Sequence, residues 1–287
     1  ADIRAELQQY DLALSDIEHL LNREPQSANL HYEKGSICLR KTDTISAFDS
    51  FKRATELDSQ NPSNWSALGL VQLMLNQQDE ALESLTKSID QGSKWAGDYM
   101  NRGVIYYQRH NYRGALSDLD KAVSLSPKDV QCYYNRGILR SEVGDYNRAI
   151  EDFSQAIDLA PDKMEIYYNR GLVQLQLRQW NAALSDFQTI ILTHPYFIPA
   201  YYLAAQAETS LGHDKKAYTL RQKAYELEQE KNNTQSLQTD MQLAEAQPQQ
   251  RDRRKDFSAR AAQNQESDAN ENKYDSDGNL IQHGEIY

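Results

Sequence analysis

Cysteine, glycine, proline and long apolar runs are all scarce in this chain of 287 residues. Two cysteines, Cys38 and Cys132, are too few for a disulfide framework, and with so few histidines nearby they exclude a four-ligand zinc site. The 12 glycines and 7 prolines are few for a β-rich protein, which favours long helices. No stretch approaches the roughly 18 consecutive apolar residues of a transmembrane helix, so the sequence predicts no membrane span.

Positive charge is also in short supply. The chain has 31 Lys and Arg against 42 Asp and Glu, which gives a formal net charge of -11. An acidic surface repels phosphate backbones, so we expect no nucleic-acid partner. The first ten residues, ADIRAELQQY, have neither a basic start nor an apolar run and therefore contain no signal peptide. A chain without disulfides is compatible with either redox compartment.

Internal repetition is the strongest feature of the sequence. Small residues recur every 34 residues, at Gly35, Gly69, Gly103, Gly137, Gly171 and Ala205. Twelve residues after each stands an alanine, in the series Ala13, Ala47, Ala81, Ala115, Ala149, Ala183 and Ala217. Four residues before each small residue stands a ring, in the series His31, Trp65, Tyr99, Tyr133, Tyr167 and Tyr201. A period of this length is typical of stacked supersecondary units.

Each unit is predicted to contain two antiparallel helices of about 14 residues joined by a short turn. Gly144 can adopt the positive φ that ends a first helix, and Asp145 is expected to cap the second. The small residue and the alanine are expected to face each other where the two helices cross, because no bulky side chain would fit there.

The pattern resembles the tetratricopeptide repeat (TPR), W-x2-L-G-x2-Y followed by A-x3-F and a closing proline. The resemblance implies an all-α TPR solenoid, a right-handed superhelix of antiparallel helix pairs, with a polar C-terminal tail. It places six full repeats at 28–61, 62–95, 96–129, 130–163, 164–197 and 198–231. Repeats 28–61 and 62–95 depart from the pattern, because Ser59 and Ser93 stand where the closing proline is expected.

The two ends of the chain differ from the repeats. Residues 1–27 are predicted to form a partial repeat with a truncated first helix, which indicates that the chain is a fragment of a longer protein. A capping helix is expected over 232–249, and 250–287 are expected to be disordered. Phrases such as DTISAFDSFKRATELD are similar to those of large exported bacterial TPR proteins, which favours an exported or periplasmic location over a cytoplasmic one.

The first helices of a TPR solenoid line a concave face, and the candidate site lies there. Asparagine occupies the sixth repeat position in three successive repeats, at Asn101, Asn135 and Asn169. Tyrosine occupies the fifth position at Tyr134, Tyr168 and Tyr202. An asparagine can donate to and accept from a peptide backbone, and tyrosine adds flat apolar area with a polar tip. Superhelical TPR proteins that resemble this chain use such an asparagine ladder. The alternative is that asparagine only caps or hydrates its helix.

Other sites find little support in the sequence. The lysines of the TPR carboxylate clamp are replaced by Tyr or Ser, and the arginines Arg102, Arg136 and Arg170 are expected to cover apolar surface with their stems while their heads reach water. No HExxH or phosphate-loop motif occurs, so we expect neither an enzyme nor a cofactor. The stretch Asp275–Asn279 fits a turn between short strands better than a calcium loop.

The sequence therefore predicts a protein-interaction scaffold that binds an extended peptide or partner protein in the concave groove. Two alternatives stay open. The solenoid could instead have a structural role through self-association as a homo-oligomer, or it could be the targeting module of a longer protein.

Overall fold

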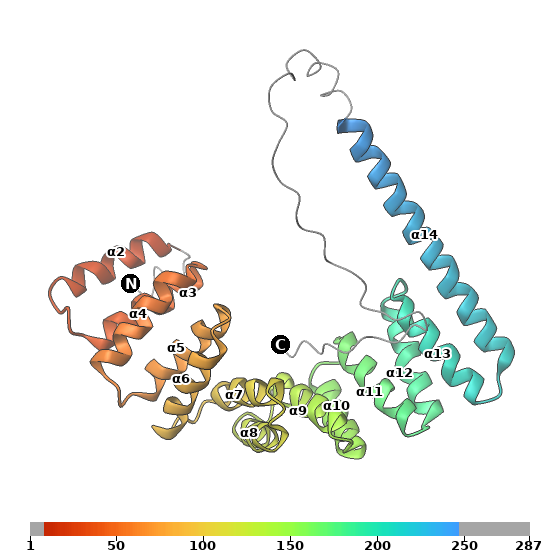
Figure 1. The fold of residues 1–287 in the computed structure, drawn as a ribbon, viewed down its shortest axis with the longest axis horizontal. Helices are drawn as coiled ribbons and strands as arrows, with labels where there is room; N and C mark the ends of the chain where they lie inside the picture. The colour runs from red at the N-terminus through yellow and green to blue at the C-terminus, as the bar shows by residue number, and fades with distance from the viewer. Residues whose placement is uncertain (1–8, 247–287) are drawn as a thin grey trace, which may run out of the picture. The chain divides into compact units, whose positions relative to one another are not determined.

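The computed structural model describes residues 9–246, with side chains described up to residue 233. The truncated first helix expected at the N-terminus and the tail expected over 250–287 lie outside these residues. Within them, thirteen helices follow one another and no strand occurs. The chain forms two compact units, one ending at Pro161 and the other beginning at Asp162. The prediction of an all-α TPR solenoid is confirmed at the level of its helix pairs (Figure 1).

The first unit holds a single helix followed by four helix pairs. The single helix is α2 (Tyr10–Leu21), and the pairs are α3 (Ala28–Arg40) with α4 (Thr44–Leu57), α5 (Pro62–Met74) with α6 (Gln78–Asp90), α7 (Ala96–Gln108) with α8 (Tyr112–Leu125), and α9 (Val130–Glu142) with α10 (Tyr146–Leu159). Each helix packs against its predecessor and its successor within the unit.

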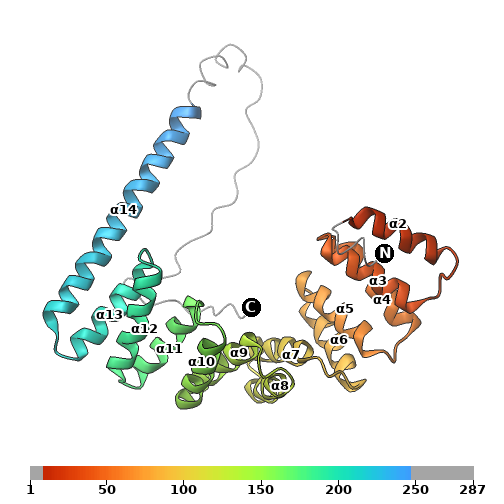
Figure 2. The ribbon, with the colours of Figure 1, turned by 180° about the vertical axis from the view of Figure 1, so that it is seen from behind.

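The second unit holds two pairs. They are α11 (Met164–Gln176) with α12 (Trp180–Thr193), and α13 (Ile198–Ser210) with α14 (Asp214–Ala246). The last helix is one uninterrupted element of 33 residues, shown in blue in Figures 1 and 2. The segment expected to form a separate capping helix is therefore, up to Ala246, the end of α14.

The pairs share one register. Counting from the first residue of each first helix, all six first helices cover positions 1 to 13 and all six second helices begin at position 17. Position 15 adopts a positive φ in every pair, at Thr42, Asn76, His110, Gly144, Arg178 and Gly212. The amide that follows it bonds back to the carbonyl of position 11, for example from Asp145 to Arg140 over 2.8 Å. Each first helix thus ends in the left-handed turn that satisfies its last carbonyls.

The capping prediction was wrong for one residue. Asp145 precedes α10, but its side chain accepts no capping hydrogen bond from the helix. It lies 3.4 Å from the guanidinium of Arg148 instead. Equivalent caps do form at Asp43, which accepts from the Ser46 amide, and at Asn111, which accepts from Gly114.

The glycine at position 8 packs closely against the second helix of its pair. A Cβ on Gly103 would lie 3.3 Å from the carbonyl oxygen of Ala115, the expected alanine, and 3.2 Å from Leu119. A Cβ on Gly137 would lie 2.8 Å from a ring carbon of Phe153, and one on Gly171 would lie equally close to Phe187. These rings come from position 24, one helical turn after the buried alanines. In these two pairs the absent side chain therefore makes room for the phenylalanine ring of the second helix.

Candidate functional site

The three asparagines occupy position 6 of α7, α9 and α11, the place that the repeat register predicts. Asn101 and Asn135 belong to the first unit and Asn169 to the second. Their surroundings differ, because Asn135 is completely buried whereas Asn101 and Asn169 are half-buried. Asn135 therefore does not present its side chain to solvent, as a residue of a binding face would.

The hydrogen bonds of these amides differ as well. The Nδ2 of Asn169 donates to the carbonyl of Glu165, one turn earlier in α11, over 2.9 Å. The side chain thus bonds to the backbone of its own helix, four residues back, and does not cap the helix end. Asn101 has no hydrogen-bond partner among the residues that the structure describes. Its amide can therefore donate to and accept from an external group.

The tyrosines of position 5 pack partly against the core of their own pair. The ring of Tyr134 lies 6.1 Å from that of Phe153, and the ring of Tyr168 lies 6.4 Å from Phe187 and 5.5 Å from Phe197. Tyr202 is more open, with 40% of its surface exposed. Burial and the neighbouring carboxylate of Glu228 raise its pKa, so its hydroxyl is a hydrogen-bond donor at neutral pH.

The arginines that follow the asparagines do not send their heads into water, contrary to expectation. Arg102 donates two hydrogen bonds to Asp118, at 2.8 and 2.9 Å, and both side chains are largely buried. Two further pairs repeat this arrangement, Arg136 with Asp152 and Arg170 with Asp186. Each pair links the first helix to the second within one repeat, so these arginines are committed to the fold and not to an anion.

The middle pair is extended into a network. Arg140, one turn after Arg136, also binds Asp152, over 2.8 Å, and both arginines reach the half-exposed Asp120 of the preceding second helix. Burial lowers the pKa of Arg136, but the hydrogen bonds and negative charges of Asp152 and Asp120 together outweigh it and raise the pKa above its ordinary value. Asp118, Asp152 and Asp186 recur at position 23, and this recurrence is the sequence signal from which the pairs could have been predicted.

The rings of position 4 have a structural role that the sequence analysis also missed. Five of these rings, all except Tyr167, bond to a carbonyl six residues earlier, in the connection that precedes the helix. Trp65 Nε1 donates to Ser59 over 2.8 Å and Tyr201 donates to Pro195 over 2.9 Å. Tyr99 and Tyr133 make the same bond at 3.3 Å. These aromatic residues therefore fix the connections and are not available to a ligand.

The metal-ligating side chains and the two thiols were the remaining candidates for a site in the described part of the chain. No group of three His, Cys, Asp or Glu side chains lies close enough to hold a metal there. Cys38 and Cys132 are free and buried, and burial raises the pKa of both thiols, that of Cys132 to about 12 with a contribution from Asp129. Between residues 9 and 246, no helix is both long and apolar enough to cross a bilayer.

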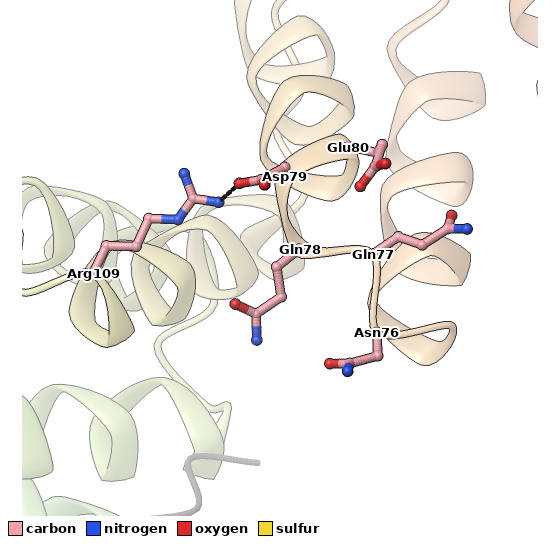
Figure 3. A pocket seen from close by; sticks show the side chains of 6 residues that line it. All are labelled: Asn76, Gln77, Gln78, Asp79, Glu80 and Arg109. Carbon is pink, nitrogen blue, oxygen red and sulfur yellow. Dashed lines mark hydrogen bonds and ion pairs between the residues drawn. The ribbon is translucent and has the colours of Figure 1, made fainter.

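Two surface pockets occur in the first unit. One, of about 640 Å³, lies at the turn between α5 and α6 and is lined by polar side chains. Arg109 reaches across it from the end of α7 and pairs with Asp79 (Figure 3). The Asp79 side chain is 88% exposed, so solvent screens this pair. The other pocket, of about 620 Å³, lies along the first helices α3 and α5 and is lined by aromatic and aliphatic side chains as well as polar ones.

Sequence comparison supports the repeat reading along much of the chain. Models of the tetratricopeptide repeat match residues 1–62, 96–129 and 119–151, and a further model of the TPR repeat matches 140–177. A search of curated proteins found no match.

Solved structures share the fold. YrrB, described as a TPR protein with an unusual peptide-binding site, is 19% identical, with a TM-score of 0.59 over 67% of this chain and 97% of its own. A tetratricopeptide repeat protein from Parabacteroides merdae is 23% identical, with a TM-score of 0.55 over 70% of this chain and 79% of its own. The Cut9–Hcn1 hetero-tetramer of the APC/C gives a TM-score of 0.54 at 18% identity over 78% of this chain and 44% of its own. The repeated helix pairs, the matched family models and these folds together identify the chain as a tetratricopeptide repeat protein.

Proposed function

We propose that this chain is a protein-interaction scaffold whose first helices bind an extended peptide. The residues that we assign to binding are Asn101, Asn169, Tyr134, Tyr168 and Tyr202, whereas Asn135 holds the same repeat position but is buried. The observation that carries the proposal is the half-buried amide of Asn101, which has no hydrogen-bond partner among the described residues. The same residue type recurs at the same position of α9 and α11. Asparagine side chains that recur every 34 residues and bind the backbone of a peptide would recognise that peptide with little dependence on the peptide's own side chains.

The family supports this proposal in a general way. TPR proteins typically mediate protein–protein interactions and are generally not catalytic. YrrB, which shares the fold, is described as a TPR protein with a peptide-binding site. We infer that the present chain likewise acts by binding and not by catalysis. From sequence phrases such as DTISAFDSFKRATELD we also infer an exported location, which fractionation of the source cells would test.

The experiment begins with peptides selected from a random display library on the wild-type protein. Each asparagine that bonds to the peptide backbone should contribute roughly 0.5–1.5 kcal/mol. The double variant Asn101→Ala, Asn169→Ala should therefore weaken binding by about 1–3 kcal/mol, or about one to two decades in Kd by calorimetry. Asn135→Ala is assayed separately with a melting curve, because that side chain is buried.

A matched control uses two exposed asparagines of second helices, Asn147 in α10 and Asn181 in α12. Their replacement by Ala should leave the Kd unchanged. If the double variant binds as tightly as the wild type while the control behaves as expected, the peptide contacts other residues and the assignment to the asparagines is wrong.

A structural role through self-association is the second candidate. It is favoured by Tyr218 and Tyr225, which lie seven residues apart on α14 and are 63% and 55% exposed. If the solenoid assembles through this helix, the wild type should sediment as an oligomer and Tyr218→Ser with Tyr225→Ser should sediment as a monomer. A monomeric wild type at high concentration would exclude this role for the chain.

A further inference from the structure

The pocket along α3 and α5 of the first unit is lined by aromatic and aliphatic side chains and by none of the proposed binding asparagines. Its floor includes Tyr32, Leu39 and Leu70, which come from positions 5, 12 and 9 of α3 and α5. Its mouth is bounded by Trp95, a side chain that is 51% exposed. The volume of about 620 Å³ lies within the range of ordinary ligand pockets.

The connection that carries Trp95 differs from the others in the unit. The helix before this connection, α6, ends at Asp90 after 13 residues, whereas α4, α8 and α10 each have 14 residues. Gly92 then adopts a φ of +86, and the amide of Ser93 bonds back to the carbonyl of Ser88 over 3.1 Å. This serine stands where the repeat pattern expects proline, so the departure seen in the sequence produces a turn of its own shape.

A buried carboxylate holds this connection in place. Asp98 is completely buried in the first turn of α7 and accepts hydrogen bonds from three serine hydroxyls, of Ser66, Ser88 and Ser93, at 2.6–2.7 Å. The Ser93 hydroxyl also accepts from the Trp95 amide over 3.2 Å. The bonds therefore tie α5, α6 and the connection to α7, and they position Trp95 beside the pocket.

The indole ring of Trp95 is also held by packing against α7. A Cβ added to Gly97 would lie 2.8 Å from the Trp95 ring, so the ring packs on the backbone of the first turn of α7. An exposed tryptophan in a fixed position provides a large apolar contact area at little further entropic cost.

The rim of the pocket carries the opposite charge to the chain as a whole. Arg40 and Lys94 both line it and are exposed, and neither forms a hydrogen bond or ion pair with a residue that the structure describes. Two unpaired cations in a chain of net charge -11 complement an anionic ligand.

We propose that this pocket binds a partner peptide in which one aromatic or large aliphatic side chain is flanked by acidic residues. The apolar side chain enters between Trp95, Tyr32 and Leu70, and the flanking carboxylates pair with Arg40 and Lys94. This specificity is separate from the backbone contacts proposed for the asparagines, because none of the asparagines lines the pocket.

The test uses four synthetic peptides of equal length and their binding by fluorescence anisotropy. The parent has one Phe between two pairs of Glu, the second replaces Phe by Ala, the third replaces Glu by Lys, and the fourth replaces Glu by Gln. The parent should bind, and each of the other three should bind at least about tenfold more weakly. Raising the salt concentration should weaken the parent and leave the Gln peptide unchanged.

Variants of the protein then locate the site. Trp95→Ala, and the double variant Arg40→Glu, Lys94→Glu, should each weaken the parent peptide at least about tenfold, with unchanged melting temperatures. Controls are Tyr196→Ala, an exposed aromatic of the second unit, and Lys128→Glu, an exposed cation of another connection. The double variant Asn147→Ala, Asn181→Ala, which replaces exposed residues of second helices, should retain binding. Absence of parent binding, equal binding of all four peptides, or undiminished binding by the Trp95 variant would overturn the proposal.

Discussion

At the scale of single residues, the packing of a helix pair with glycine at position 8 depends on that residue, which has no side chain. Gly137 makes room for the Phe153 ring, and Gly103 does the same for the smaller Leu119. A Cβ would lie 2.8 Å from the ring in the first case and 3.2 Å from the leucine in the second, so a side chain added at Gly137 is the more crowded of the two.

The replacement Gly137→Leu should overpack this contact. We expect a loss of about 1–3 kcal/mol or more in the free energy of unfolding, measured by chemical denaturation. Gly103→Ala is the matched control and should stay within about 1 kcal/mol of the wild type, because the gain in helix propensity offsets the tighter contact. Equal stability of the Gly137 variant and the wild type would show that the ring does not pack there.

The cysteines give a second prediction at this scale. Thiolate is the reactive form, and a pKa of about 12 leaves only about one Cys132 thiol in 10,000 ionised at pH 8. Ellman's reagent should therefore react slowly with the native protein and rapidly with both thiols in denaturant. Cys38, whose pKa is also raised, should follow the same order. Rapid labelling of the native protein would contradict the buried positions of these residues.

At the scale of helices, the recurring devices are the left-handed turn at position 15 and the Arg–Asp pair between positions 7 and 23. The turn is occupied by glycine at Gly144 and Gly212 but by a β-branched residue at Thr42, whose φ is 65°. The left-handed region disfavours such a residue by about 1–2 kcal/mol.

Thr42→Gly should therefore raise the free energy of unfolding, by up to about 1 kcal/mol after the entropy of the added glycine is counted. The reciprocal change, Gly144→Thr, should lower it by about 1–2 kcal/mol. Thermal and urea denaturation of both variants check the sign. A stable Gly144→Thr variant would mean that the turn is easily rebuilt.

The Arg–Asp network gives the other prediction at this scale. Asp152→Ala would leave Arg136 and Arg140 without their buried carboxylate, so unfolding should become easier by about 3–5 kcal/mol. Glu56→Ala removes the partner of the exposed Arg53 and should change stability by only about 0.2–1 kcal/mol. Similar small losses for both variants would show that the buried network contributes little.

These elements also show how far sequence reasoning reaches. The period of 34, the two helices per repeat and the position of each asparagine follow from residues that recur along the chain. The Arg–Asp partners lie 16 residues apart on different helices, so their contact depends on how a pair packs. The same holds for Asn135, which shares its residue type and position with Asn101 and yet is buried. Repeat position specifies the backbone, and the local neighbours decide exposure.

At the scale of the whole molecule, the features assigned to binding are distributed along first helices while ion pairs and large rings hold each pair together. Asn101 lies on α7, and the pocket with Trp95 lies between α3, α5 and the start of α7. The described second helices supply the rings and carboxylates that stabilise the pairs. This division predicts that ligand binding changes the surroundings of first-helix side chains and leaves the contacts within each helix pair intact.

The central claim, that asparagine side chains on the first helices bind a peptide backbone, is tested most directly by NMR of their side-chain amides. Asparagine-labelled protein is titrated with a peptide selected on the wild type, and Asn147 and Asn181 serve as internal references. We predict that the Nδ2 resonances of Asn101 and Asn169 shift and show NOEs to the peptide backbone, while those of the references stay in place. If the peptide is bound and the resonances of Asn101 and Asn169 do not move, the first-helix asparagines are not the binding residues.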